Sequence, residues 1–283
     1  MNPVEEMLAQ APYLRLDAEL TVELLTRALR EEVGKTGFRK VILGVSGGID
    51  SALALFLCAR AFGPEGVLAV CMPYRESSPD SLKDAREAVE AVGVESVTVD
   101  ITPQIDAYFA GFPDASPLRR GNKMARERMS ILYDLSAEHQ ALVIGTSNKT
   151  ELLLGYGTQH GDMASAVNPL GDLYKTQVRQ LSAHLGVPES ILKKPPSADL
   201  WPDQTDEAEL GFSYLEVDRL LHFMVDRRYS RERLVRRGFD PELVDRVHRR
   251  VVANQYKRRL PVILKVSGRT IGADFRYPRD WGL

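Results

Sequence analysis

The clearest chemical pattern in this chain is a short segment in which an apolar run passes through a glycine turn into a helix-like pattern. It reads Val41-Ile-Leu-Gly-Val-Ser-Gly-Gly-Ile-Asp-Ser51. Glycines let successive backbone N–H groups turn toward one point, and the unsatisfied N–H groups of a first helical turn add partial positive charge there. The segment therefore predicts a phosphate-binding turn. The residues assigned to it are Gly44, Val45, Ser46, Gly47, Gly48, Ile49, Asp50 and Ser51.

Two acids follow predicted strands and are candidate metal ligands. Asp50 lies inside the turn, which lacks both the Gly-Lys-Ser/Thr ending and the spaced G-x-G-x-x-G of the common phosphate motifs. A carboxylate beside phosphates is unfavourable unless a cation separates them, so we predict that Asp50 binds Mg²⁺. Glu151, in Gly145-Thr-Ser-Asn-Lys-Thr-Glu151, is the predicted second ligand. The structural alternatives are a helix cap for Asp50 and a dipole-favoured first-turn acid for Glu151.

Apolar, β-rich runs alternate with amphipathic segments up to about residue 170, and helical patterns follow. This alternation predicts an α/β fold with a doubly wound parallel sheet and a helical C-terminal portion. In such sheets ligands gather beyond the carboxyl ends of the strands, where segments 46–51, 73–80 and 146–151 all fall. We predict one domain over 1–283, with a sheet-forming part at 17–170 and a mainly helical part at 171–260. Predicted strands are 41–45, 67–72, 94–99 and 141–145; predicted helices are 17–33, 51–57 onward, 81–92, 118–139, 172–185, 214–226, 230–237 and 241–257.

Composition is that of an ordinary globular protein. The 283 residues are 44% hydrophobic, and 37 basic against 39 acidic side chains give a net charge of −2, which does not indicate nucleic-acid binding. The sequence contains no apolar run of membrane-spanning length and no signal-peptide pattern near its start, so we expect a cytoplasmic protein without a membrane partner. Cys58 and Cys71 are expected to be buried thiols, because no second cysteine pair or nearby histidine accompanies them.

The turn resembles the pyrophosphate loop of the N-type ATP pyrophosphatases, and further motifs are similar to the NAD synthetase family. These motifs occur in family order over roughly residues 20–260. They are Asn122-Lys-Met-Ala-Arg-Glu-Arg-Met129, Gly145-Thr-Ser-Asn-Lys-Thr-Glu151, Gly155-Tyr-Gly-Thr-Gln-His-Gly-Asp162, Asp172-Leu-Tyr-Lys-Thr-Gln177, and Pro196 to Leu200 through Gln204 to Glu207. The resemblance implies ATP- and Mg²⁺-dependent amidation of deamido-NAD to NAD through an adenylated intermediate, with release of pyrophosphate and AMP.

The resemblance also implies roles for single residues on the ATP side. Arg126, Thr146, Lys175 and Thr205 match positions that contact ATP or the adenylated intermediate, and Asp50, Lys175 and Glu151 are the expected catalytic residues. A lysine early in a helix opposes the helix dipole, so Lys175 requires a nearby anion. Arg126 and Arg128 are two residues apart on one helix and point to different sides, so we expect one of them at most to reach phosphate directly.

Departures from the family pattern concentrate on the dinucleotide side. Gln159 stands where shorter bacterial members carry a lysine, Ala166 where they carry an acid, and Tyr256-Lys257 where they carry His-Lys. The expected deamido-NAD-binding residues are Arg126, Gln159, Tyr256 and Lys257. Chain length leaves no room for a fused amidase domain, so ammonia is the expected nitrogen donor, and a separate glutaminase partner is not indicated.

Two other functions fit part of the pattern, and the family implies an assembly. The nearer alternative is another adenylating pyrophosphatase, either amidating or tRNA-modifying, although no basic tail or zinc-type cysteine set supports RNA modification. The more distant one is a non-catalytic ATP-binding sensor on the same sheet. The family resemblance further implies a homodimer with deamido-NAD bound near the subunit interface.

Overall fold

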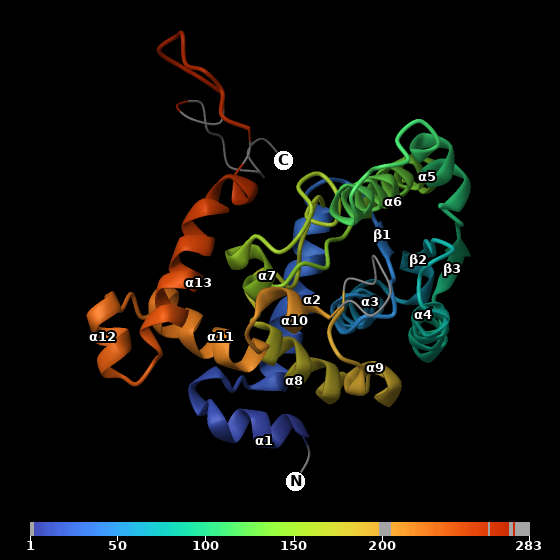
Figure 1. The fold of residues 1–283 in the computed structure, drawn as a ribbon. Helices are drawn as coiled ribbons and strands as arrows, with labels where there is room; N and C mark the ends of the chain where they lie inside the picture. The colour runs from blue at the N-terminus through green and yellow to red at the C-terminus, as the bar shows by residue number, and fades with distance from the viewer. Residues whose placement is uncertain (1–2, 198–204, 260, 272–273, 275–283) are drawn as a thin grey trace.

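The computed structural model describes residues 3–197, 205–259, 261–271 and 274 of the chain. The fold contains a four-stranded parallel sheet in the order β3-β2-β1-β4, of which β1, β2 and β3 are labelled in Figure 1. Its strands are β1 (Lys40–Gly44), β2 (Val67–Cys71), β3 (Glu95–Thr98) and β4 (Ala141–Val143). Because β1 pairs with both β2 and β4, the strand order reverses next to β1, which is where a doubly wound sheet binds its ligands.

The helices before β4 alternate with the strands, and those after it form the C-terminal portion. Before β4 they are α1 (Pro3–Gln10), η1 (Pro12–Leu14), α2 (Ala18–Gly34), α3 (Ile49–Phe62), η2 (Pro64–Gly66), α4 (Pro79–Val92), α5 (Thr102–Phe109) and α6 (Pro117–His139). After β4 they are α7 (Lys149–Leu154), α8 (Lys175–Leu185), α9 (Glu189–Lys193), α10 (Asp206–Leu210), α11 (Tyr214–Leu221), η3 (His222–Asp226), α12 (Arg231–Arg236), α13 (Pro241–Ala253) and η4 (Gln255–Arg258).

Both faces of the sheet are covered, as the apolar strands require. Successive side chains of a strand point to opposite faces, so Val41 and Leu43 of β1 join one core while Ile42 joins the other. The first core contains α2, α3 and α8, and the second contains α5 and α6. A third core lies among the helices after β4 and includes Val217, Leu221 and Val247. The predicted α/β doubly wound parallel sheet with a helical C-terminal portion is therefore confirmed.

Several predicted boundaries differ from the observed ones. The helix expected from residue 172 begins at Lys175, because Tyr174 is its extended N-cap residue and its first turn is held by contacts from elsewhere in the fold. The helix expected over 214–226 changes to π-helical geometry at His222. The helix expected over 241–257 ends at Ala253 before a 3₁₀ turn. Residues 198–204, part of the predicted Pro196–Glu207 motif, lie outside the described residues.

Other sequence expectations concern burial and membranes. Cys58 and Cys71 are buried and free, as predicted. Within the described part of the chain, none of the helices combines the length and apolar character needed to span a bilayer. The assignment of 1–283 to one domain stays a prediction.

Candidate functional site

The predicted phosphate-binding turn connects the end of β1 to the start of α3. Ser51 Oγ accepts a hydrogen bond from the Ser46 N–H at 3.1 Å and donates to the Gly48 carbonyl at 2.9 Å, which closes the turn. Gly47 has a φ of +79°, and a Cβ added there would lie 2.1 Å from the Ser81 carbonyl oxygen. Gly48 is the N-cap residue of α3 and provides no side-chain cap. The first N–H groups of α3 therefore have no side-chain acceptor from their N-cap and suit an anion.

Asp50 and Glu151 are brought together by Asn148, a residue that the sequence reasoning did not single out. Asn148 caps α7: its side chain accepts from the Glu151 N–H at 3.0 Å, and Glu151 Oε2 accepts from the Asn148 N–H at 3.3 Å. The Asn148 amide also donates to Asp50 Oδ1 at 2.8 Å. Asp50 is thus not the cap of its own helix. The Asn-x-x-Glu pattern of a capping box was the available signal in the sequence.

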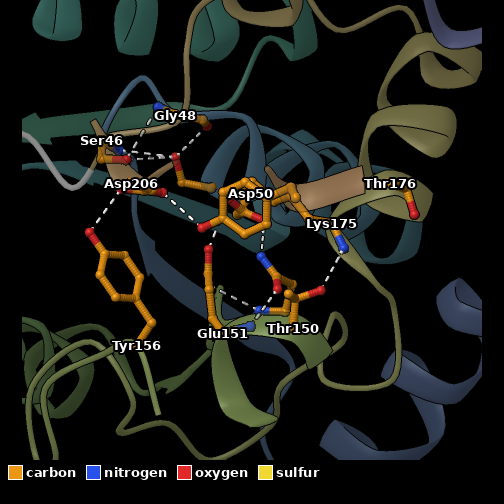
Figure 2. Close-up of polar contacts among 12 residues, drawn as sticks. Ser46, Gly48, Asp50, Thr150, Glu151, Tyr156, Lys175, Thr176 and Asp206 are labelled. Carbon is orange, nitrogen blue, oxygen red and sulfur yellow. Dashed lines mark hydrogen bonds and ion pairs between the residues drawn. The ribbon is translucent and has the colours of Figure 1, made fainter. Parts of the chain in front are cut away.

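Lys175 supplies the cation that both carboxylates face. Its Nζ lies 2.5 Å from Asp50 Oδ2 and 3.1 Å from Glu151 Oε1, and its side chain is 3% exposed (Figure 2). The ammonium also lies 4.9 Å from the centroid of the Tyr214 ring. The position of Lys175 at the start of α8 opposes the helix dipole, and these acids are the anions that offset it.

A third carboxylate extends the cluster. Asp206, at the start of α10, accepts hydrogen bonds from Tyr156 at 3.1 Å and Tyr214 at 2.9 Å (Figure 2). Neither tyrosine has a local sequence signal for this contact, because Tyr156 follows α7 in a loop and Tyr214 begins α11. The described geometry places Asp206 in the same polar cluster as Lys175.

The charges in this cluster do not balance. Burial and the neighbouring acids raise the pKa of Glu151, although Lys175 opposes the shift. Burial alone would lower the pKa of Lys175, but Asp50, Glu151 and Asp206 together raise it, so the ammonium stays charged at neutral pH. Three acidic side chains therefore surround one lysine. Because burial raises the pKa of Glu151 to about 8, this acid holds a proton at neutral pH, and a cation bound beside it would favour its ionised form.

The donor set fits a magnesium ion. Mg²⁺ prefers hard oxygen ligands and commonly binds one or two protein carboxylates, with water and phosphate oxygens completing its shell. Asp50 and Glu151 provide such oxygens beside the phosphate-binding turn, where negative charge is in excess. Among the described residues, no group of three or more histidine, cysteine or acidic side chains is gathered for a metal. An ion held by Asp50 and Glu151 would complete its shell with water or phosphate oxygens.

A cavity of about 580 Å³ opens between the turn and the cluster. Its volume falls within the range typical of small-molecule sites. The carboxyl ends of β1, β2 and β4 meet there, as predicted. The predicted site residues that line it are Gly44, Val45, Ser46, Gly48, Asp50, Ser51, Thr146, Glu151, Lys175 and Lys257.

The remaining predicted residues do not line this cavity. Arg126 donates to the Gln159 carbonyl at 3.2 Å, so these two lie together, and Tyr256 is 59% exposed. Thr205 is the N-cap residue of α10 and makes no side-chain cap. Gly47 forms the turn without facing the cavity, and Ile49 belongs to the core.

Arg128 is the arginine of α6 that lines the cavity. Its Nε donates to the Met72 carbonyl at 3.0 Å, at the end of β2. The spacing predicts that at most one arginine of the pair reaches phosphate directly, and the resemblance implies Arg126 for the ATP side. In this structure Arg128, not Arg126, has the position for such a contact.

The parallel sheet, the phosphate-binding turn after its first strand and the acid–lysine cluster at the same edge define an α/β protein of the adenine nucleotide alpha-hydrolase-like type. The family model described as NAD synthase matches residues 21–261. The chain therefore belongs to the NAD synthetase family.

Curated relatives match over nearly their full length. The chain is 59% identical over 269 residues to "NH(3)-dependent NAD(+) synthetase" from Trichlorobacter lovleyi, covering 95% of this chain and 98% of that protein. It is 56% identical over 268 residues to the protein of the same name from Chlorobium phaeobacteroides, covering 95% and 97%.

Solved structures show the same fold. An NH3-dependent NAD synthetase from Campylobacter jejuni has a TM-score of 0.77 at 37% identity, covering 89% of this chain and 100% of that one. An NMN synthetase from Francisella tularensis has a TM-score of 0.78 at 31% identity, with the same coverage. A glutamine-dependent NAD+ synthetase from Acinetobacter baumannii is matched over 94% of this chain but 50% of its own length, with a TM-score of 0.67 and 31% identity.

Proposed function

We propose that the cavity at the carboxyl ends of β1, β2 and β4 performs both half-reactions of this ligase. Family membership and the curated relatives support ATP-dependent amidation of deamido-NAD with ammonia. The observation that carries the assignment of the site is the Lys175 ammonium between Asp50 and Glu151, beside the phosphate-binding turn. A non-catalytic ATP sensor has no need for this buried charge cluster.

The chemistry activates a carboxylate that is otherwise a poor acyl donor. In the first half-reaction an oxygen of the nicotinate carboxylate bonds to the α-phosphorus of ATP, and the bond to the bridging oxygen breaks to release pyrophosphate. In the second, ammonia attacks the carboxyl carbon, the carbon–oxygen bond to AMP breaks, and the nitrogen loses a proton to form the amide. The protein contributes mainly by orienting the reactants and stabilising the charge that moves to the leaving groups.

Each part of the site has a role in this scheme. The N–H groups at the start of α3 bind triphosphate oxygens, and Thr146 and Thr205 are proposed further contacts to ATP or to the adenylate. Lys175 stays charged and neutralises the departing pyrophosphate. Arg128 lines the ATP-facing wall, while Arg126, Gln159, Tyr256 and Lys257 remain the proposed deamido-NAD side of the site.

Asp50 and Glu151 would hold the Mg²⁺ ion. When bound, the ion would neutralise negative charge on the phosphate oxygens. Asn148 fixes both carboxylates at the turn and thereby sets where a cation can bind.

Product analysis tests the proposed reaction directly. Purified protein with ATP, Mg²⁺, deamido-NAD and ammonium should produce NAD, AMP and pyrophosphate in equal amounts. Nicotinate mononucleotide in place of deamido-NAD tests the neighbouring amidating reaction, and glutamine in place of ammonium tests the nitrogen donor. We expect low rates with both replacements. ATP binding without pyrophosphate release would instead support a sensor.

The metal assignment has its own test. Asp50→Asn combined with Glu151→Gln should lower turnover by about 10²-fold or more, because neither amide carries the charge that attracts a divalent ion. The variant should also lose ATP-dependent Mn²⁺ binding, measured by electron paramagnetic resonance. Unchanged turnover and unchanged Mn²⁺ binding would contradict the proposed ligands.

We also propose a cytoplasmic homodimer that acts on small molecules without nucleic acid, a membrane or a dedicated glutaminase partner. Exposed apolar side chains support an interface: Leu20 and Leu24 lie one turn apart on α2 and are 51% and 57% exposed. Sedimentation at several concentrations tests the dimer. Leu24→Glu should weaken it, and a fully active monomer would argue against a shared site.

A further inference from the structure

Asp218 is a completely buried acid that the proposed reaction does not use. It lies on α11 with 0% exposure, four residues after Tyr214 and therefore on the same helix face. Tyr214 contacts Lys175 with its ring and Asp206 with its hydroxyl. One face of α11 thus presents two polar side chains toward the catalytic cluster.

The two oxygens of Asp218 bind two different helix starts. Oδ1 accepts from the Thr150 hydroxyl of α7 at 2.5 Å, and Oδ2 accepts from the Thr176 backbone N–H of α8 at 2.8 Å. Thr150 Oγ1 in turn accepts from the Lys175 backbone N–H at 3.0 Å (Figure 2). A continuous set of hydrogen bonds therefore joins α11, α7 and α8.

These contacts flank two residues of the active cluster. Thr150 precedes Glu151, and Thr176 follows Lys175, so the bonds hold the backbone on either side of the ion pair. The first turn of α8 lacks a side-chain cap hydrogen bond from its own N-cap residue, and Asp218 together with Thr150 takes two of its N–H groups.

A carboxylate suits this position better than an amide. The Thr150 hydroxyl oxygen already accepts from Lys175, so it presents its proton to Asp218, and Thr176 presents an N–H. Both partners are therefore donors. An aspartate can accept from both, whereas an asparagine offers one acceptor and would direct its NH₂ at the other donor.

We propose that Asp218 is a positioning residue that fixes the Lys175 ammonium and the Glu151 carboxylate relative to each other through Thr150 and Thr176. This inference rests on the proposed function, in which Lys175 and Glu151 act on the triphosphate. Asp218 does not line the cavity.

A double-mutant cycle tests whether Asp218 acts through Lys175. Asp218→Asn should lower kcat by about 10²-fold and change KM for ATP by less than about threefold, because misplacing the lysine affects the transition state more than binding. In a Lys175→Met background the same change should have little further effect. Asp226→Asn is the matched control, since Asp226 bonds the Tyr174 hydroxyl but neither Thr150 nor Thr176. If Asp218→Asn lowers kcat by the same factor with and without Lys175→Met, the two residues act independently and the proposal is wrong.

Thr150 provides a second route if Asp218→Asn does not fold. Thr150→Val removes the hydroxyl at nearly constant shape and should lower kcat, while Thr150→Ser keeps the hydroxyl and should restore it to within about threefold. Equal loss in both variants would contradict positioning by this hydroxyl.

A readout without turnover separates this inference from the proposed reaction. Acylation of Lys175 by an amine reagent, measured by peptide mass spectrometry, should rise several-fold in Thr150→Val, while Lys194, held by Asp84, should not change. This holds even if deamido-NAD is not the substrate. Equal increases at both lysines, or none at Lys175, would overturn the proposal.

Discussion

The inner and outer halves of the proposed site are built differently, and of the outer half only Lys257 lines the cavity. The inner half comprises the turn Ser46–Ser51 with Glu151 and Lys175. Its charged side chains face one another, with Lys175 3% exposed and Asp50 and Glu151 each 16% exposed. The outer half comprises Arg126, Gln159, Tyr256 and Lys257. Its polar groups face backbone carbonyls or solvent: Lys257 Nζ donates to the Gly155 and Gly157 carbonyls at 2.8 and 2.9 Å.

This difference shows where function constrains residue type. A buried charge must have a partner, so changing one member of the inner half leaves another charge uncompensated. An exposed side chain loses little when its neighbour changes. The departures from the family pattern that the resemblance implies are Gln159, Ala166 and Tyr256, and two of these three belong to the outer half. The inner half should therefore be intolerant of substitution and the outer half adaptable.

The largest effect is expected from Lys175→Met. The change removes the cation between Asp50 and Glu151 and the charge that meets the departing pyrophosphate, so pyrophosphate release should fall by about 10³-fold. Lys149→Met is the control, because Lys149 also pairs with two acids, Asp172 and Asp226, but does not line the cavity. If pyrophosphate release falls less than tenfold in Lys175→Met, or falls equally in both variants, the inner half is not more sensitive to substitution than the rest of the protein.

The second effect concerns the turn itself. Gly47→Ala forces a side chain into positive φ and against the Ser81 carbonyl, whereas Gly93→Ala meets positive φ with nothing within 4 Å. The strain common to both is about 1–2 kcal/mol, so Gly93→Ala should lose about that much unfolding free energy and keep its ATP affinity. Gly47→Ala should lose more unfolding free energy than Gly93→Ala and should bind ATP weakly. Urea unfolding and ATP titration measure both, and indistinguishable variants would show that the close approach to Ser81 is unimportant.

A smaller effect is expected in the outer half. Lys257→Met removes two hydrogen bonds that hold the Gly155–Gly157 backbone, so KM for deamido-NAD should rise about tenfold while KM for ATP stays within about twofold. Tyr133→Phe should change neither constant, because Tyr133 of α6 is 46% exposed and does not line the cavity. Steady-state kinetics, with each substrate varied in turn, measures both KM values. A change confined to the ATP constant would reassign Lys257 to the inner half.

Much of the inner half could be predicted from sequence because its signals are local. The apolar run, the glycines and the first helical residues all lie within eleven positions, and their physical requirements agree. The role of Lys175 came from the family resemblance, and its place at a helix start, which needs a nearby anion, agrees with that role. The convergence of three loops followed from strand alternation alone, since parallel strands present their carboxyl ends at one edge.

The remaining contacts join distant parts of the chain and leave no local signal. Asp218 and Thr150 are 68 residues apart, and an acid in an amphipathic helix ordinarily indicates a solvated face. Tyr156 and Tyr214 meet Asp206 from separate elements. The two-residue spacing of Arg126 and Arg128 indicated that they point to different sides, but the packing of α6 on the sheet decides which one lines the cavity.

The smallest expected effect concerns the buried acid behind the inner half. Burial raises the pKa of Asp218 to about 6 from its usual 3.8, although the Thr150 and Thr176 hydrogen bonds oppose the shift. The folded state therefore holds this proton more tightly than the unfolded state. The resulting stabilisation is complete below about pH 4 and is lost as the pH rises through 6. Deprotonation of Asp218 should therefore lower the free energy of unfolding by about 1 kcal/mol as the pH rises from 5 to 7.

Asp218→Asn lacks that titration, so its unfolding free energy should fall less than that of the unsubstituted protein over this interval, even if it is less stable throughout. Asp245 is the contrasting control: its exposed carboxylate is bonded by Arg231, which lowers its pKa. The stability that Asp245 contributes is present above its unfolded pKa and is lost in more acidic solution, so Asp245→Asn should leave the change between pH 5 and 7 as it was. Urea unfolding at the two pH values measures all three proteins. If the unfolding free energy of all three proteins falls by the same amount between pH 5 and 7, Asp218 does not take up a proton near pH 6 in the folded protein.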